Sequence, residues 1–210
     1  MGLVLLHGLG TGPEAWQPQL DELGPEWTVL APRVRLDCGF TIEREAERLL
    51  RQLPAEPFDL CGLSLGALVA LRMTLDDPGR VRRLALCAGF ASLPVRFRLL
   101  QAAVGTIAAL VPARARGELG SLDRSAVRAV FREGRRFDVS AELGRLRMPV
   151  LVLVGERDRA NTGLSTALAE ALPHARLEVV TGAGHVANVD APEAFTAALR
   201  SFLDGDDPQP

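Results

Sequence analysis

Ser64 is the residue of this 210-residue chain whose surroundings most clearly indicate chemistry. It lies at the centre of the run GLSLG at 62–66, which matches the pattern G-x-S-x-G. An apolar run at 58–61 precedes the motif, and residues at helical spacing follow it. A strand that turns at once into a helix strains the backbone of the turn residue. Only small residues fit two positions before and two positions after that residue. The pattern predicts an exposed serine nucleophile; the alternative is an ordinary glycine-flanked turn.

A serine hydroxyl is a weak nucleophile at neutral pH and needs a base, for which the three histidines are the candidates. His185 follows the last apolar strand in a glycine-rich loop, which predicts that it lies at the same sheet edge as Ser64. Its alternative role is to cap the following helix. His7 follows the first strand, and we expect its ring mainly to organise the next loop. His174, between a helix and a strand, is expected to be solvated at the far end of the sheet.

An acid is needed to orient the base, and the strand at 149–154 ends in the run GERD at 155–158. Asp158 is the predicted acid, and Glu156 is the second candidate. A buried carboxylate in contact with His185 would fix the tautomer of the ring and stabilise the imidazolium that forms. Without that role, Asp158 would form an ion pair with Arg157 inside the loop.

Charge that develops on the substrate oxygen requires preorganised N–H donors. The backbone N–H of Leu65, directly after the nucleophile, is one predicted donor, and the backbone N–H of Leu9 in the glycine-rich loop at 7–12 is the other. That loop lacks both common phosphate-binding patterns, so a nucleotide site is not indicated. We expect His7 and Gly8 to border the substrate pocket.

Six apolar runs separated by helical patterns predict the architecture. Strands are expected near 3–6, 27–31, 58–61, 81–87, 149–154 and 176–180. Strands that alternate with helices indicate a mainly parallel sheet with helices on both faces. No strand is expected between 90 and 147, where apolar helical stretches near 94–111 and 122–136 predict a helical lid. The sequence thus predicts one α/β domain over residues 1–210 with a lid inserted at about 90–147.

These segments together resemble the α/β-hydrolase superfamily, in particular its small single-domain esterases and lactonases. The matching segments follow the family's order over nearly the whole chain: HGLG at 7–10, GLSLG at 62–66, PVLVLVGERD at 149–158 and GAGHVAN at 182–188. The resemblance implies a serine hydrolase with Ser64, Asp158 and His185 as its triad and no cofactor or metal.

Three features depart from the family pattern. We expect the two strands that usually precede the His-Gly loop to be missing, because Met1 leaves no room for them in this sequence. The segment 33–39 lacks the usual glycine-rich turn with an aspartate, and Ala67 stands where the family often has a second glycine. The first departure leaves a sheet edge open to pairing in a homodimer; none removes a catalytic group.

The lid segment bears on the substrate. It carries eleven arginines and five acidic residues, so it is cationic. This positive charge would suit a substrate with a distal carboxylate. The simpler interpretation is that the arginines lie on solvated helix faces of an arginine-rich chain. The apolar run that includes Leu99 and Val104 is suited to roof an acyl pocket, or to pack against the sheet. The expected substrate is a small ester with an apolar acyl part.

The composition argues against several other classes of function. With 24 basic and 26 acidic residues, the chain shows no general affinity for nucleic acid or anionic membranes. No apolar run approaches membrane-spanning length and no signal peptide is evident, so a cytoplasmic protein is expected. Cys38, Cys61 and Cys87 lack the spacing of a zinc site and are expected to be reduced.

The leading hypothesis is a cofactor-free serine hydrolase that cleaves small carboxylic esters or lactones through an acyl-enzyme on Ser64. Acyltransferases, C–C bond hydrolases and perhydrolases of the same fold keep a similar triad, so the sequence leaves them open. A ligand receptor built on the same pocket is an alternative from another class. A metal-dependent hydrolase is a weaker third hypothesis, because the chain has no HExxH motif.

Overall fold

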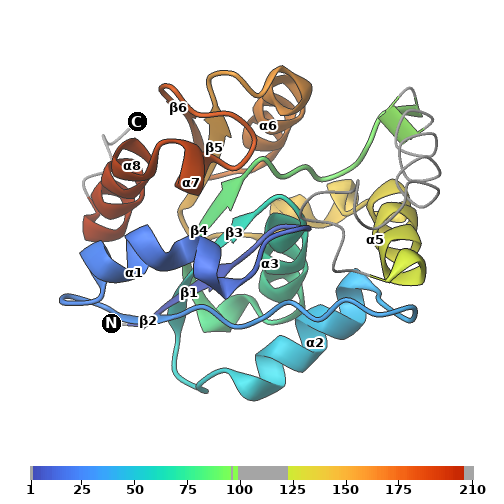
Figure 1. Cartoon of the computed structure of the whole chain (residues 1–210), viewed down its shortest axis with the longest axis horizontal. Coiled ribbons are helices and arrows are strands. Elements are labelled where there is room, and N and C mark those ends of the chain that lie inside the picture. Colours follow the sequence, from blue (N-terminus) through green and yellow to red (C-terminus); the bar gives the residue numbers. More distant parts are fainter. Residues whose placement is uncertain (1, 96, 99–122, 206–210) are drawn as a thin grey trace.

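The computed structural model of the chain describes residues 2–95, 97–98 and 123–205 (Figure 1). These residues contain a six-stranded sheet in the order β2-β1-β3-β4-β5-β6, in which every neighbouring pair is parallel. The strands are β1 (Gly2–Leu6), β2 (Thr28–Leu30), β3 (Phe58–Leu63), β4 (Val81–Cys87), β5 (Val150–Gly155) and β6 (Ala175–Val180). Each strand coincides with an apolar run, and the predicted parallel α/β sheet is confirmed.

Alternate side chains of the strands enter two cores, one on each face of the sheet. In β1, Leu3 and Leu5 belong to one core, whereas Val4 and Leu6 belong to the other. The second core lies under α2 (Ile42–Gln52), α3 (Leu65–Asp76) and α6 (Arg159–Ala171). The first lies under α1 (Gln17–Leu23) and α8 (Pro192–Asp204), on the opposite side of the sheet (Figure 1).

Shorter elements connect these helices and strands. They are η1 (Pro13–Trp16), η2 (Pro78–Arg80), η5 (Ser140–Arg145) and α7 (Ala187–Asp190). The start of α2 agrees with the sequence pattern, because the Thr41 hydroxyl accepts a hydrogen bond from the backbone N–H of Arg44 at 3.2 Å. The sequence pattern predicts a helix only from residue 162, because the polar first turn carries no apolar periodicity, whereas α6 begins at Arg159. No helix in the described ranges is long and apolar enough to cross a membrane.

The structure covers the predicted lid only in part, at 90–95, 97–98 and 123–147. There, α5 (Arg124–Arg136) corresponds to the helix expected near 122–136. Most of the stretch expected near 94–111 lies outside the described residues. The division into one domain and an inserted lid stays a prediction.

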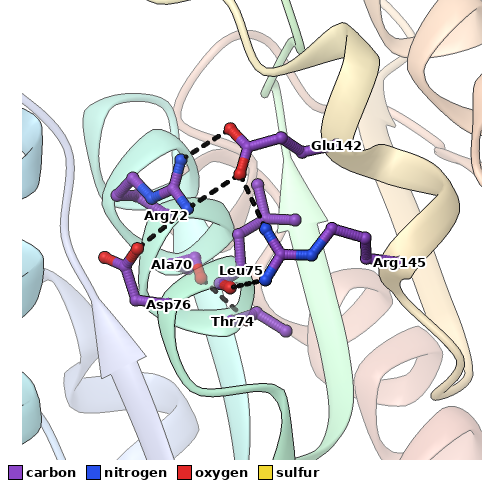
Figure 2. Close-up of polar contacts among 7 residues, drawn as sticks. All are labelled: Ala70, Arg72, Thr74, Leu75, Asp76, Glu142 and Arg145. Atoms are coloured by element: carbon purple, nitrogen blue, oxygen red, sulfur yellow. Dashed lines mark hydrogen bonds and ion pairs between the residues drawn. The ribbon is translucent and has the colours of Figure 1, made fainter.

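An ion-pair cluster joins η5, near the end of the predicted lid, to α3 (Figure 2). Glu142 accepts hydrogen bonds from Arg72 at 3.0 Å and from Arg145 at 2.9 Å. Arg72 also contacts Asp76 at 2.8 Å, and Arg145 donates to the carbonyl of Leu75 at 3.2 Å. The hydrogen bond from Arg72 lowers the pKa of the Glu142 carboxyl, and Arg145 adds to the effect.

Replacing Glu142 with glutamine is expected to lower the free energy of unfolding by about 1 kcal/mol at neutral pH, because the charge that two arginines contact is lost. The pKa of Glu142 is depressed in the folded state, so its stabilising effect is present above the unfolded pKa. The effect disappears as the pH falls through the folded pKa. Urea unfolding of wild type and Glu142→Gln at neutral and at acidic pH measures the difference in the free energy of unfolding under each condition.

The matched control is Glu47→Gln, because the exposed Glu47–Arg51 pair lies on the surface of α2. This control should change the free energy of unfolding by no more than a few tenths of a kcal/mol. The stabilising role of the Glu142 carboxylate would be contradicted if Glu142→Gln changed the free energy of unfolding no more than the control does. It would also be contradicted if the change were equally large at acidic pH.

Candidate active site

Ser64 lies at the turn between β3 and α3, as the motif predicts. Its backbone angles are φ 53° and ψ −114°, and a positive φ is unusual for a residue with a side chain. The N–H of Ser64 donates to the carbonyl of Cys87 at the end of β4, at 2.8 Å. The neighbouring strand therefore holds a strained turn, which presents the serine hydroxyl at the N-terminus of α3.

The two glycines of the motif are required by close backbone contacts. A Cβ added to Gly62 would lie 2.4 Å from the carbonyl oxygen of Gly66. A Cβ added to Gly66 would lie 2.1 Å from the carbonyl oxygen of Leu6 at the end of β1. Both distances are far inside van der Waals contact. The pattern has glycine at 62 and 66 because the backbones of β1, β3 and α3 pack too closely at these positions to admit a Cβ.

Three polar side chains form a continuous hydrogen-bonded chain at this edge of the sheet. The Ser64 Oγ lies 3.0 Å from Nε2 of His185, and Nδ1 of His185 lies 2.7 Å from Oδ2 of Asp158. The residues follow β3, β6 and β5, whose carboxyl ends meet because the strands are parallel. An imidazole placed in this way can take a proton from the serine while the carboxylate holds its other nitrogen.

The His185 and Asp158 side chains of this hydrogen-bonded chain differ in exposure. The side chain of His185 is 47% exposed, whereas that of Asp158 is 5% exposed. Burial raises the pKa of the Asp158 carboxyl, but hydrogen bonds from His185 and Asn161 outweigh burial and leave this pKa below its ordinary value. The carboxylate is thus ionised when it faces the imidazole.

Sequence reasoning missed Asn161. Its side-chain Nδ2 donates to both carboxylate oxygens of Asp158, at 2.9 Å each, and lies 3.2 Å from Nδ1 of His185. The available signal was the helical spacing of three residues between Asp158 and Asn161. Because the helix was expected to begin at 162, Asn161 was placed outside it.

The loop that carries His185 is held by the end of β5 and by nearby carboxylates. A Cβ on Gly155 would lie 2.0 Å from the carbonyl oxygen of Gly184, so this glycine permits the close approach. Glu156, the second candidate acid, accepts a hydrogen bond from the backbone N–H of Gly182 at 2.8 Å. Arg157 also donates to the carbonyl of Gly182. Glu156 and Arg157 therefore hold the loop, while the Asp158 carboxylate contacts His185.

The loop after β1 lies against Ser64. A Cβ on Gly8 would lie 3.4 Å from the Cβ of Ser64. His7 is 2% exposed; its Nδ1 lies 2.9 Å from the carbonyl of Gly8, and its Nε2 accepts from the backbone N–H of Val34 at 3.0 Å. Burial lowers the pKa of His7, in keeping with a neutral ring that accepts at Nε2. The expectation that His7 organises the loop is confirmed; the oxyanion roles of Leu9 and Leu65, and the contact of His7 and Gly8 with substrate, stay predictions.

The sequence model described as "Alpha/beta hydrolase family" matches residues 3–198 of the chain. The chain belongs to the alpha/beta hydrolase family. The observed parallel sheet, with the turn at Ser64 between β3 and α3, is the fold of that family, as the resemblance implied.

Similar members of the alpha/beta hydrolase family are known by sequence and by structure. A Shigella flexneri protein provisionally named carbamate hydrolase RutD is 30% identical, over 96% of this chain and 90% of its own. The pimeloyl-[acyl-carrier protein] methyl ester esterase of Neisseria meningitidis is 27% identical, over 97% and 77%. The crystal structure of a hydrolase from Pseudomonas aeruginosa superposes with a TM-score of 0.81 at 28% identity, over 96% and 89%. These relatives support hydrolase activity in this chain.

Of the remaining predicted residues of this alpha/beta hydrolase, the structure describes His174, which lies away from the chain of hydrogen bonds. His174 is exposed just before β6, at the amino end of the strands, as expected. Leu99 and Val104 lie outside the described residues. Among the described residues, no group of three or more His, Cys, Asp or Glu side chains is arranged to hold a metal ion.

A cavity of about 400 Å³ lies between α6 and the segment at 91–97. Arg159, next to Asp158 in sequence, is part of its lining, and small and apolar side chains predominate along its walls. It is lined by Ala91, Ser92, Pro94, Phe97, Ser140, Arg159, Ala160, Gly163, Leu164, Ala167, Leu168 and Ala171.

Proposed function

We propose that the chain is a serine hydrolase that cleaves small carboxylic esters or lactones through an acyl-enzyme on Ser64, without a cofactor. The observation that supports this most directly is the hydrogen-bonded chain from Ser64 through His185 to Asp158. The strained backbone of Ser64 supports it as well, since strain of this kind is concentrated at functional sites. The substrate is a small molecule, and no nucleic acid or membrane takes part.

The reaction has two halves. The Oγ of Ser64 attacks the ester carbonyl while its proton moves to Nε2 of His185, and backbone N–H groups of Leu9 and Leu65 stabilise the oxyanion. The bond to the alcohol then breaks, and His185 returns the proton to the leaving oxygen. A water molecule attacks the acyl-enzyme by the same steps, which releases the acid and restores Ser64. Asp158 holds the His185 ring throughout and stabilises its protonated form.

Cleavage of a carbamate is a second candidate, because the relative with 30% identity carries that name. The first half-reaction is the same, but the leaving group or the acyl-enzyme then contains nitrogen. A panel of aryl esters, lactones and aryl carbamates separates the two candidates by their kcat/KM values. An acyltransferase would instead favour an added alcohol over water as the acyl acceptor.

Labelling with a fluorophosphonate, followed by intact mass and peptide mapping, tests the proposal. We expect one adduct on Ser64, and we expect it to be largely absent after His185→Ala, because the unassisted hydroxyl is a weak nucleophile. Circular dichroism of both proteins controls for folding. A folded wild-type protein that forms no adduct would sink the serine hydrolase proposal and favour a receptor function.

A further inference from the structure

The carboxylate of Asp158 is held from two sides. His185 contacts only Oδ2, at 2.7 Å, whereas the amide nitrogen of Asn161 lies 2.9 Å from both Oδ1 and Oδ2. A carboxylate held at one oxygen by a half-exposed ring is free to rotate about its terminal bond. The contact from Asn161 to both oxygens opposes that rotation and keeps Oδ2 directed at the ring.

The orientation of the Asn161 amide follows from its surroundings. The reverse orientation would place the amide oxygen 2.9 Å from two carboxylate oxygens and leave three acceptors facing one another. The same nitrogen lies 3.2 Å from Nδ1 of His185. When Nδ1 is protonated and donates to Asp158, it cannot accept a hydrogen bond from Asn161. The N–H groups of Asn161 therefore donate to the carboxylate.

The backbone N–H of Asn161 also hydrogen-bonds the Asp158 carboxylate and lowers its pKa. The neighbouring side chains within the described part of the chain do not duplicate the contact from the Asn161 amide. Cys87, at the end of β4, is buried, and burial raises the pKa of its thiol well above the ordinary value, so it stays neutral. Thr162 on α6 donates to the backbone carbonyl of Asp158 and not to its carboxylate. Arg157 is directed to Gly182, and Arg159 is exposed at the start of α6.

We propose that Asn161 is a positioning residue that acts through Asp158. It keeps the carboxylate oriented and ionised, and Asp158 in turn holds His185 with Nδ1 protonated and Nε2 free to accept the proton of Ser64. This role rests on the proposed serine hydrolase function. The lowered pKa of Asp158, to which the Asn161 hydrogen bond contributes, agrees with it.

Two variants at this position separate donation from packing. Asn161→Asp keeps the shape but replaces the donor with a second carboxylate, and Asn161→Leu removes the whole amide without adding a charge. The donor from Asn161 stabilises the ionised form of the Asp158 carboxyl, and its removal should raise the pKa of that carboxyl. Both variants should therefore move the acid limb of the kcat/KM profile to higher pH, by about one unit for Asn161→Asp and less for Asn161→Leu. At neutral pH, kcat should fall about tenfold in both.

The matched control is Thr162→Val, which removes a hydrogen bond to the backbone of Asp158 one residue further along α6. It should leave both the acid limb and kcat close to wild type. If the acid limbs of Asn161→Asp and Asn161→Leu coincide with that of wild type while both proteins are folded, Asn161 is not a positioning residue.

A second measurement needs no substrate. The ¹⁵N shifts of His185 in the free protein report which ring nitrogen carries the hydrogen. We expect Nδ1–H in wild type and in Thr162→Val, and a mixture of tautomers in Asn161→Leu. Unchanged tautomers in Asn161→Leu would overturn the proposal. Because this readout is independent of turnover, failure of the hydrolase proposal would appear separately, as a wild-type Ser64 that takes no fluorophosphonate.

Discussion

Alanine at position 64 is expected to lower kcat for ester hydrolysis roughly a million-fold, the effect seen when the nucleophile of a serine hydrolase is removed. Without the Ser64 Oγ, no acyl-enzyme forms, and His185 has no hydroxyl from which to take a proton. Any residual rate comes from binding and oxyanion stabilisation alone, roughly a thousand- to ten-thousand-fold over water. Steady-state kinetics on an activated aryl ester measures the loss, with active sites counted by titration of wild type.

The matched control is Ser201→Ala, on α8 across the sheet from α3, which should leave kcat within about twofold of wild type. The free energy of unfolding of Ser64→Ala should lie within about 0.5 kcal/mol of the wild-type value, because alanine keeps the same strained backbone without adding a clash. A Ser64→Ala protein that retains a tenth of the wild-type kcat would show that another group performs the chemistry.

A second large effect is expected from Gly66→Ala, on stability as well as activity. The added Cβ would lie 2.1 Å from the carbonyl oxygen of Leu6 and 2.7 Å from that of His7, both backbone atoms that cannot turn away. Either α3 moves away from β1 or the sheet deforms. We expect the free energy of unfolding to fall by about 3–5 kcal/mol. Because α3 begins directly after Ser64, the remaining folded protein should also lose at least roughly a hundredfold in kcat/KM.

Gly163→Ala is the matched control for this substitution. Gly163 is also a helical glycine, in α6, but a Cβ there would meet nothing within 4 Å. Alanine at 163 should therefore raise the free energy of unfolding by about 0.5–1 kcal/mol through helix propensity. Urea unfolding of the two variants compares them directly. A Gly66→Ala protein as stable as wild type would mean that the approach of α3 to β1 is looser than described.

The positions of the strands and the polar residues that follow them were readable from local sequence. Runs such as 150–154 are apolar at every position, which is typical of a strand buried on both faces. The motif around Ser64 and the loops after β5 and β6 were expected at one edge, because parallel strands end together. The proximity of Ser64, Asp158 and His185 follows from that topology. The lid and its residues Leu99 and Val104 stay predictions.

What the sequence determined by itself was which segments form strands and which residue types follow them, since apolar runs and glycine-flanked turns are local signals. Tertiary structure alone decided which of two neighbouring acids faces His185: Asp158 contacts the ring, whereas Glu156 holds the backbone of its loop. It also decided that Asn161 lies beside His185 and that Glu142 contacts Arg72. Both contacts join residues on different elements, and they form only when the packed cores set the spacing of those elements.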